Sequence, residues 1–245
     1  MPINRQSFES ELSLVFKSNG LGAYLDKKKS ELFFSLTERM LEENEKYNLT
    51  AITEPGKIIL NHYADCALLA KRLPHGAKII DVGCGAGFPT LPLAIVREDL
   101  SIVAMDSTAK RVNYVRESAE LLGLGNVTAT VARAEDAARL DEYRERFDFA
   151  TARAVAQMRV LCELCLPFVK VGGALFAMKG KNAEFELSGA KKAISILGGA
   201  EATVESVTLC GNGEELTHPI ITVRKRTKTP SAYPRPYAQI SKKPL

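Results

Sequence analysis

The chain has 245 residues, of which 46% are hydrophobic and 25% are charged. This length and composition match a soluble globular protein with one main domain and an appendage. No apolar run approaches a membrane-spanning length, and the first residues lack the apolar stretch of a secretory signal. Five cysteines, a small and odd number, indicate reduced thiols and exclude a disulfide framework. We therefore expect a cytoplasmic protein.

The net charge of +4 is distributed unevenly. Seven basic residues follow Glu215 with no acidic residue among them: Arg224, Lys225, Arg226, Lys228, Arg235, Lys242 and Lys243. In the rest of the chain, acidic residues slightly outnumber basic ones. A basic C-terminal tail suggests a polyanionic partner, and the alternative is a solvated, disordered end. The composition leaves both interpretations open.

Residues 7–72 carry apolar side chains at helical spacing, for example Leu32, Leu36 and Met40. This pattern predicts a helical appendage over residues 1–75. Pro55 suits the first turn of a further helix. We expect Asn61 to separate that helix from a last one that ends near Pro74.

From Ala77 onward, short β-rich runs alternate with helical stretches. The expected strands are residues 78–82, 101–106, 127–131, 147–152 and 174–178, and the expected helices are residues 91–96, 109–122, 158–169 and 183–197. Such alternation predicts βαβ units and a parallel sheet. Two final strands, 202–209 and 219–226, flank the turn Gly211-Asn212-Gly213 and predict an antiparallel hairpin.

This order of elements predicts an α/β fold of the class I S-adenosylmethionine-dependent methyltransferase type. The Rossmann-like domain is expected over residues 76–226, after the helical appendage and before a basic tail over residues 227–245. The prediction is an analogy of fold and does not by itself establish a function.

A glycine-rich loop, Asp81-Val82-Gly83-Cys84-Gly85-Ala86-Gly87-Phe88-Pro89, joins the first expected strand to a helix. Glycines there allow a tight turn and a close approach of a ligand, and helix N-terminal amides bind an anionic group. In S-adenosylmethionine that group is the methionine carboxylate, so we expect Gly83 and Gly85 to contact the cofactor. The third glycine comes one residue earlier than in the nicotinamide pattern, which disfavours an oxidoreductase. The alternative is a structural turn that binds nothing.

Acidic residues follow three of the expected strands. Asp81 ends the first strand and suits the ammonium group of a bound methionine. Asp106 ends the second, where a carboxylate accepts hydrogen bonds from ribose hydroxyls, or caps the next helix. Ala134 and Glu135 follow the third strand, where such enzymes place the adenine, and two acids that open a helix are the alternative.

Several separated motifs resemble the bacterial 16S ribosomal RNA guanine-N7 methyltransferases, also called the glucose-inhibited division protein B family. The resemblance covers most of the chain and rests on Tyr47-Asn48-Leu49-Thr50-Ala51-Ile52, His62 with Asp65, residues 81–89, Asp106-Ser107 with Lys110-Arg111, Ala134-Glu135, Arg153-Ala154-Val155 and Lys179-Gly180. Two departures are Cys66, where the family often has serine, and a tail that lacks the expected glycine after Arg235.

The resemblance implies specific roles for individual residues. The implied S-adenosylmethionine site uses Gly83, Phe88, Ala134, Glu135 and Arg153, and the implied acceptor-guanine site uses Asn48, His62, Arg153 and Lys179. It also implies 16S ribosomal RNA or the small ribosomal subunit as the partner, with no metal and no membrane.

Methylation at guanine N7 needs no general base, because this nitrogen carries an in-plane lone pair. Alignment is then the main contribution, and proximity and orientation supply about 7–11 kcal/mol. Consistently, the segment after the fourth strand, Thr151-Ala152-Arg153-Ala154, lacks the Asn- or Asp-Pro-Pro-aromatic motif of amine-methylating enzymes. Cys162 and Cys165 are expected to be buried helix residues, and neither a nucleophile nor a metal pair.

Arg153 and Lys179 follow the fourth and fifth strands, on the sheet edge where doubly wound folds bind ligands. Arginine stacks on bases and lysine holds phosphates. Without the resemblance, solvated cations and a buried structural His62 are the simpler interpretations. Residues 224–228 and the tail, with Tyr233 and Tyr237 stacked on unpaired bases, are expected to complete RNA binding.

Two other functions remain open at this point. A class I methyltransferase for a small molecule would share the glycine loop but needs no basic tail. An RNA-binding assembly factor would keep a cofactor pocket without turnover.

Overall fold

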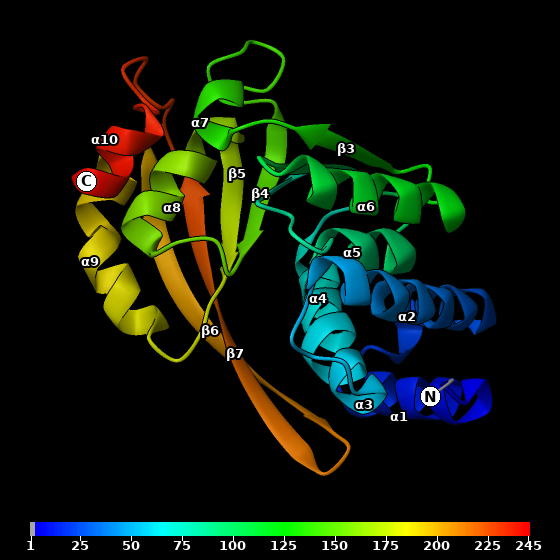
Figure 1. Cartoon of the computed structure of the whole chain (residues 1–245). Coiled ribbons are helices and arrows are strands. Elements are labelled where there is room, and N and C mark those ends of the chain that lie inside the picture. The colour runs from blue at the N-terminus through cyan, green and yellow to red at the C-terminus, as the bar shows by residue number, and fades with distance from the viewer. Residues whose placement is uncertain (1–2) are drawn as a thin grey trace.

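The computed structural model describes residues 3–245 and contains one sheet with helices on both faces (Figure 1). The sheet has seven strands in the order β3-β2-β1-β4-β5-β7-β6. The strands are β1 (Lys78–Val82), β2 (Ser101–Asp106), β3 (Val127–Val131), β4 (Phe147–Arg153), β5 (Val169–Met178), β6 (Gly199–Gly211) and β7 (Glu214–Lys225). Strands β1 to β5 pair in parallel, and β7 is antiparallel to both β5 and β6. The predicted parallel sheet with an antiparallel hairpin is confirmed.

The α-helices are α1 (Arg5–Ser18), α2 (Lys27–Tyr47), α3 (Pro55–Ile58), α4 (Asp65–Ala67), α5 (Thr90–Val96), α6 (Ala109–Leu121), α7 (Ala134–Ala137), α8 (Met158–Cys165), α9 (Ala183–Ile196) and α10 (Tyr237–Lys242). Asn4 and Asp26 cap α1 and α2, because each side chain accepts a hydrogen bond from a backbone amide three residues later. Over residues 3–245, none of the helices has both the length and the apolar character needed to cross a bilayer.

The predicted helix break at Asn61 is wrong. The helical backbone runs from α3 through a π-helical stretch (Ile59–Ala64) and α4 into a 3₁₀ stretch (Leu68–Arg72). The Asn61 side-chain amide donates to the Lys57 carbonyl, one turn earlier in the same helical run. Neighbours such as Ile58 and Leu60 are buried, so packing overrides the local propensity of asparagine. The π-helical stretch carries His62 at its centre.

The two faces of the sheet have separate apolar clusters, set by the alternation of side chains along each strand. Ile79 packs in the cluster that contains the buried residues of α1, α2, α5 and α6. Ile80 packs in the cluster formed with α8, α9 and Ile240 of α10. The N-terminal helices therefore share one core with the sheet and do not form a core of their own.

The helices change face between β1 and β4, which are neighbours in the sheet (Figure 1). Helices α5 and α6, which follow β1 and β2, lie on one face, whereas α8 and α9, which follow β4 and β5, lie on the other. A crevice forms at such a switch point, outside the carboxyl ends of the strands, and ligands bind there in open α/β sheets. The loops after β1 and β4 therefore define where a site is expected.

The β6–β7 hairpin is longer than predicted and projects beyond the other strands toward α1 and α3 (Figure 1). Its end is fixed to the N-terminal helices by Asn19, which follows α1. The Asn19 side chain donates to the Cys210 carbonyl at 2.8 Å and accepts from the Cys210 amide at 2.9 Å. The hairpin thus ties the N-terminal helices to the far edge of the sheet.

The basic residues near the C-terminus are not all available to RNA. Lys225 is buried, donates to the Leu166 carbonyl at 2.8 Å, contacts the Thr229 hydroxyl and lies 3.6 Å from Glu145. Burial lowers the pKa of Lys225 to about 8. The expectation that residues 224–228 contact RNA together is therefore wrong for Lys225.

Candidate active site

The loop after β1 has the backbone that its glycines predict. Gly83, Gly85 and Gly87 have φ angles of 74°, 55° and 84°, in the region that favours glycine. A Cβ atom on Gly83 would lie 2.7 Å from Cγ2 of Val155, which follows β4. The loop therefore lies directly against the segment after β4, at the switch point of the sheet.

The two predicted strand-end carboxylates have different environments. Asp106 accepts from the backbone amides of Gly85 at 3.1 Å and Thr108 at 2.8 Å, so it holds the glycine loop in place. Asp81 is buried beneath the loop and accepts from the Thr90 hydroxyl at 2.6 Å and the Thr151 hydroxyl at 3.2 Å. Desolvation raises the pKa of Asp81 to about 6.

Three cavities that share lining residues surround this region. The central cavity, of about 470 Å³, lies between the glycine loop and residues 46–50. The Asp106 cavity extends along the ends of β2 and β3, and the Lys179 cavity lies on the side of β5 and β7. Ala154 lines all three, Gly83 lines the first two, and His62 and Arg153 line both the central and the Lys179 cavities.

The structure brings nearly all predicted site residues to these cavities. The central cavity is lined by Asn48, His62, Gly83, Gly85, Phe88 and Arg153, the Asp106 cavity by Gly83, Asp106, Ala134 and Glu135, and the Lys179 cavity by His62, Arg153 and Lys179. Asp81 lines none of the three. A direct contact between Asp81 and a ligand in these cavities is therefore not supported by its position.

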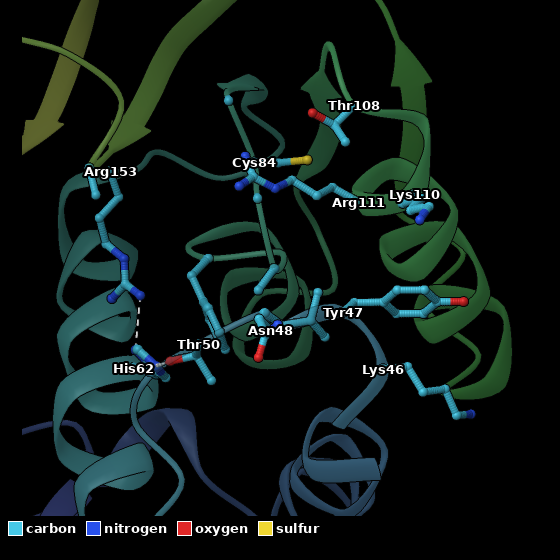
Figure 2. Close-up of a pocket in the computed structure, with 16 residues that line it drawn as sticks. Lys46, Tyr47, Asn48, Thr50, His62, Cys84, Thr108, Lys110, Arg111 and Arg153 are labelled. Carbon is cyan, nitrogen blue, oxygen red and sulfur yellow. Dashed lines mark hydrogen bonds between the residues drawn. The ribbon is translucent and has the colours of Figure 1, made fainter. Parts of the chain in front are cut away.

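Arg153, at the end of β4, is held by the π-helical stretch and α4 (Figure 2). Its Nη1 donates to the Asn61 carbonyl at 3.0 Å and lies 3.3 Å from Asp65 Oδ2, and its Nη2 donates to His62 Nδ1 at 2.9 Å. The guanidinium also lies 5.1 Å from the centre of the Phe88 ring. These contacts fix the guanidinium where the central and Lys179 cavities meet.

His62 is a neutral imidazole with one defined tautomer. Arginine has no acceptor, so Nδ1 must accept from Arg153 and Nε2 carries the proton toward the Thr50 hydroxyl, 3.0 Å away. Nδ1 also lies 3.2 Å from the Asn61 carbonyl, but that oxygen already receives Arg153. The ring stacks on Phe88 at 4.3 Å. Burial and the Arg153 charge lower the pKa of His62 to about 3.

The low pKa of His62 has a defined effect on stability. Between about 3 and the ordinary value of 6.5, the unfolded chain binds the proton and the folded chain does not. His62 therefore contributes fully to stability above about pH 6.5, and this contribution is lost as the pH falls toward 3. We expect wild type to lose more unfolding free energy than His62→Gln over this acid range, measured by denaturant titration. If the unfolding free energies of the two proteins fell in parallel as the pH is lowered, the low pKa of His62 would be contradicted.

Lys179 is already paired in this structure. Its Nζ donates to the Ala156 carbonyl at 2.6 Å and lies 2.6 Å from Glu186 of α9. The predicted role of Lys179 as a free phosphate-binding cation is not supported by this geometry. The lysine instead fixes the segment after β4 to α9, as one wall of the Lys179 cavity.

Exposed cations of α2 and α6 line the central cavity (Figure 2). Lys46, Lys110 and Arg111 line it, and the Lys110 ammonium lies 5.9 Å from the centre of the Tyr47 ring. Asn48 ends α2 in the left-handed conformation, with φ of 49°, which asparagine tolerates better than most residues. After this bend, residues 48–50 line the central cavity.

Two residues to which the sequence assigned no role, and a third expected at the RNA, lie at these cavities. His218 of β7 lines the Lys179 cavity, and its Nδ1 lies 2.9 Å from Oδ1 of the buried Asp65. Val155 packs against Gly83. Tyr237, expected to stack on RNA, lines the Asp106 cavity. Their positions depend on contacts between segments distant in sequence, for which the sequence carries no local signal.

Three cysteines of interest are buried, and burial raises the pKa of each thiol. Cys84 is in the glycine loop, and Cys162 and Cys165 are on α8. Thiols with raised pKa values are poor nucleophiles. Within residues 3–245, no group of His, Cys, Asp and Glu side chains has an arrangement that could hold a metal ion.

A family model described as rRNA small subunit methyltransferase G matches residues 29–215, which include the glycine loop, Arg153 and Lys179. The chain belongs to this family. Relatives in the family carry the same description. The protein of Clostridium perfringens (strain 13 / Type A) is 44% identical over 93% of this chain and 95% of its own length. That of Lactobacillus johnsonii is 42% identical over 99% of this chain and 100% of its own length.

Solved structures share the fold of this family member. An O-methyltransferase from Bacillus cereus, crystallised in complex with SAH, aligns with a TM-score of 0.55 at 19% identity, covering 89% of this chain and 100% of its own. A precorrin-6y C5,15-methyltransferase from Geobacter metallireducens aligns with a TM-score of 0.52 at 17% identity, covering 73% of this chain and 92% of its own. The class I methyltransferase fold predicted from the sequence is confirmed.

Proposed function

We propose that this protein transfers the methyl group of S-adenosylmethionine to N7 of a guanine in the 16S ribosomal RNA of the small subunit. Membership in the rRNA small subunit methyltransferase G family supports the reaction and the substrate class. The observation that carries the N7 assignment is the lining of the central cavity. Among the described residues, no aspartate or glutamate lines it. A cytoplasmic location follows from the proposed substrate.

The glycine loop and the Asp106 cavity fit the cofactor. Gly83 lines both the central and the Asp106 cavities, and its lack of a side chain lets Val155 pack against the loop. Asp106 would accept from ribose hydroxyls, and the backbone of Ala134 and Glu135 would meet the adenine. Gly83 and Gly85 would contact the methionine part of S-adenosylmethionine. When bound, the cofactor supplies an electrophilic methyl group on sulfonium sulfur.

The acceptor guanine would lie against His62 and Arg153, which line both the central and the Lys179 cavities. The Arg153 guanidinium is held from three sides, so it loses little freedom when it donates to the acceptor edge of a guanine. Asn48 and Thr50 also line the central cavity, with the Thr50 hydroxyl 3.0 Å from His62 Nε2, and would help to exclude water from the reacting nitrogen. These residues would align the guanine N7 with the methyl group, and alignment is the main contribution to a reaction that needs no proton transfer.

Among the described residues that line the central cavity, neither His62 nor Cys84 is free to remove a proton. The Nδ1 lone pair of His62 is occupied by Arg153. The Cys84 thiol is kept protonated by its raised pKa. Methylation of an exocyclic amine requires loss of a proton, whereas N7 of guanine is already an unprotonated nucleophile. The chemistry of the cavity therefore favours N7 over the exocyclic amine.

The test is transfer of labelled methyl from S-adenosylmethionine to in vitro transcribed 16S RNA and to assembling subunits, followed by digestion to nucleosides. We expect label in 7-methylguanosine, at one position when the RNA is cleaved at the modified base. Label in another nucleoside would keep the methyltransferase but refute the N7 assignment. No label despite cofactor binding would indicate a small-molecule methyltransferase or a non-catalytic RNA-binding factor.

A further inference from the structure

The C-terminal segment carries an aromatic side chain to the cofactor region. Tyr237 begins α10 and lines the Asp106 cavity together with Ala132, Arg133, Ala134, Glu135 and Leu164. The Arg133 guanidinium lies 5.8 Å from the centre of the Tyr237 ring and 3.2 Å from the Glu135 carboxylate. Tyr237 is thus connected through Arg133 to the loop after β3, where the adenine is expected.

Buried contacts fix this segment in place. Arg235 donates to both oxygens of the fully buried Glu163, from Nε at 2.9 Å and from Nη2 at 2.7 Å, and its backbone amide adds a third bond at 2.8 Å. Ile240 is fully buried in the apolar cluster of α8 and α9. Arg144 donates to the Tyr233 carbonyl at 2.9 Å. A segment anchored in this way holds its aromatic ring at a defined position.

The lining of the Asp106 cavity indicates which part of a ligand meets the Tyr237 ring. Asp106 is the last residue of β2, and Tyr237 lies beside Arg133 of the loop after β3; Val155 and Leu164 add apolar side chains to the lining. A purine is flat and apolar on its faces, so a cavity with apolar walls and one partly exposed aromatic ring suits it. Tyr237 is 43% exposed and lines this cavity, so part of its side chain is accessible to a ligand there.

We infer that the C-terminal segment is part of the cofactor site and that Tyr237 forms one wall of its adenine end. This inference rests on the proposed function and assigns the tail to the cofactor instead of RNA. Tyr237 does not take part in bond formation. Its contribution is to the affinity for the adenosine moiety, so it is the same for the reactive cofactor and for its demethylated product.

The chain contains no tryptophan, so Tyr237→Trp introduces a single indole as a fluorescent reporter. We expect S-adenosylhomocysteine and 5′-methylthioadenosine to change its fluorescence saturably, whereas homocysteine, which lacks the adenosine, leaves it unchanged. Phe185→Trp is the matched control, because Phe185 is 84% exposed on α9 and lines none of the three cavities. Its fluorescence should not respond to any of the three compounds.

Calorimetry of Tyr237→Ala gives the energetic test. We expect its affinity for S-adenosylhomocysteine and for methylthioadenosine to fall by the same factor, about threefold to tenfold, as for loss of an aromatic contact. Tyr237→Phe should retain the affinity, and Gln239→Ala, on the same helix, should match wild type. Unchanged cofactor affinity in Tyr237→Ala, or a silent Tyr237→Trp that still binds, would refute the inference. Failure of wild type to bind S-adenosylhomocysteine would instead refute the proposed function.

Discussion

Replacement of Arg153 by alanine is expected to reduce methyl transfer by about 100-fold or more, because misalignment of the acceptor costs this much. Arg153 is held by His62, Asp65 and the Asn61 carbonyl, and it lines two of the three cavities. The measurement is the single-turnover rate on 16S RNA at saturating cofactor. Because the effect is on alignment, the rate should fall much more than the affinity for S-adenosylhomocysteine.

Arg153→Ala also removes the cation beside the buried Asp65 and leaves His218 as its remaining partner. Loss of one partner of a buried ion pair destabilises by about 3–5 kcal/mol. Arg153→Lys separates this effect from the loss of activity. The lysine keeps a positive charge near Asp65 but cannot donate to His62 and Asn61 together. Arg153→Lys should therefore fold with nearly wild-type stability, and its methyl-transfer rate should stay far below that of wild type. Arg146→Ala, at an exposed site outside the cavities, is the control. A rate for Arg153→Lys equal to wild type would contradict the alignment role.

Gly83→Ala is expected to abolish cofactor binding and to destabilise the fold. The φ angle of 74° costs an alanine roughly 1–2 kcal/mol. The new Cβ would also lie 2.7 Å from Val155 Cγ2, so the segments after β1 and β4 must separate. Calorimetry with S-adenosylhomocysteine and thermal unfolding measure the two effects.

Gly76→Ala is a matched control, because Gly76 has a similar φ of 71° with no atom within 4 Å of the added Cβ. Gly76→Ala should lose only the stability that the positive φ angle costs an alanine, and it should keep full affinity for S-adenosylhomocysteine. The double variant Gly83→Ala, Val155→Ala should be more stable than Gly83→Ala, because the clash between the new Cβ and the Val155 side chain is removed. If Gly83→Ala binds S-adenosylhomocysteine as tightly as wild type, the cofactor does not approach the loop as proposed.

The sheet and the glycine loop could be predicted because their signals are local. A strand buried on both faces has a continuous apolar run, as residues 174–178 of β5 do. The φ angles of Gly83, Gly85 and Gly87 follow from the need for a tight turn into α5. Residues at the ends of successive parallel strands meet at one edge, so Asp106, Glu135 and Arg153 could be predicted to lie near one another.

What could not be predicted depends on contacts between distant segments. Lys225 and Arg235 have the composition of a basic tail, but their carboxylate partners, Glu145 and Glu163, lie far earlier in the chain. Asn61 has the propensity of a helix breaker, and the burial of its neighbours overrides it. The pairing of Lys179 with Glu186 likewise depends on how α9 packs beside β5.

The most direct measurement of the proposed reaction is methyl transfer to 16S RNA transcribed with 7-deazaguanosine, in which a carbon replaces the N7 nitrogen of every guanine. RNA transcribed with 7-deazaadenosine is the matched control for changes in folding. We predict that the control RNA accepts labelled methyl from S-adenosylmethionine at the same rate as unmodified RNA and that the 7-deazaguanosine RNA accepts none. Equal labelling of both would show that the methyl group goes to an atom other than guanine N7.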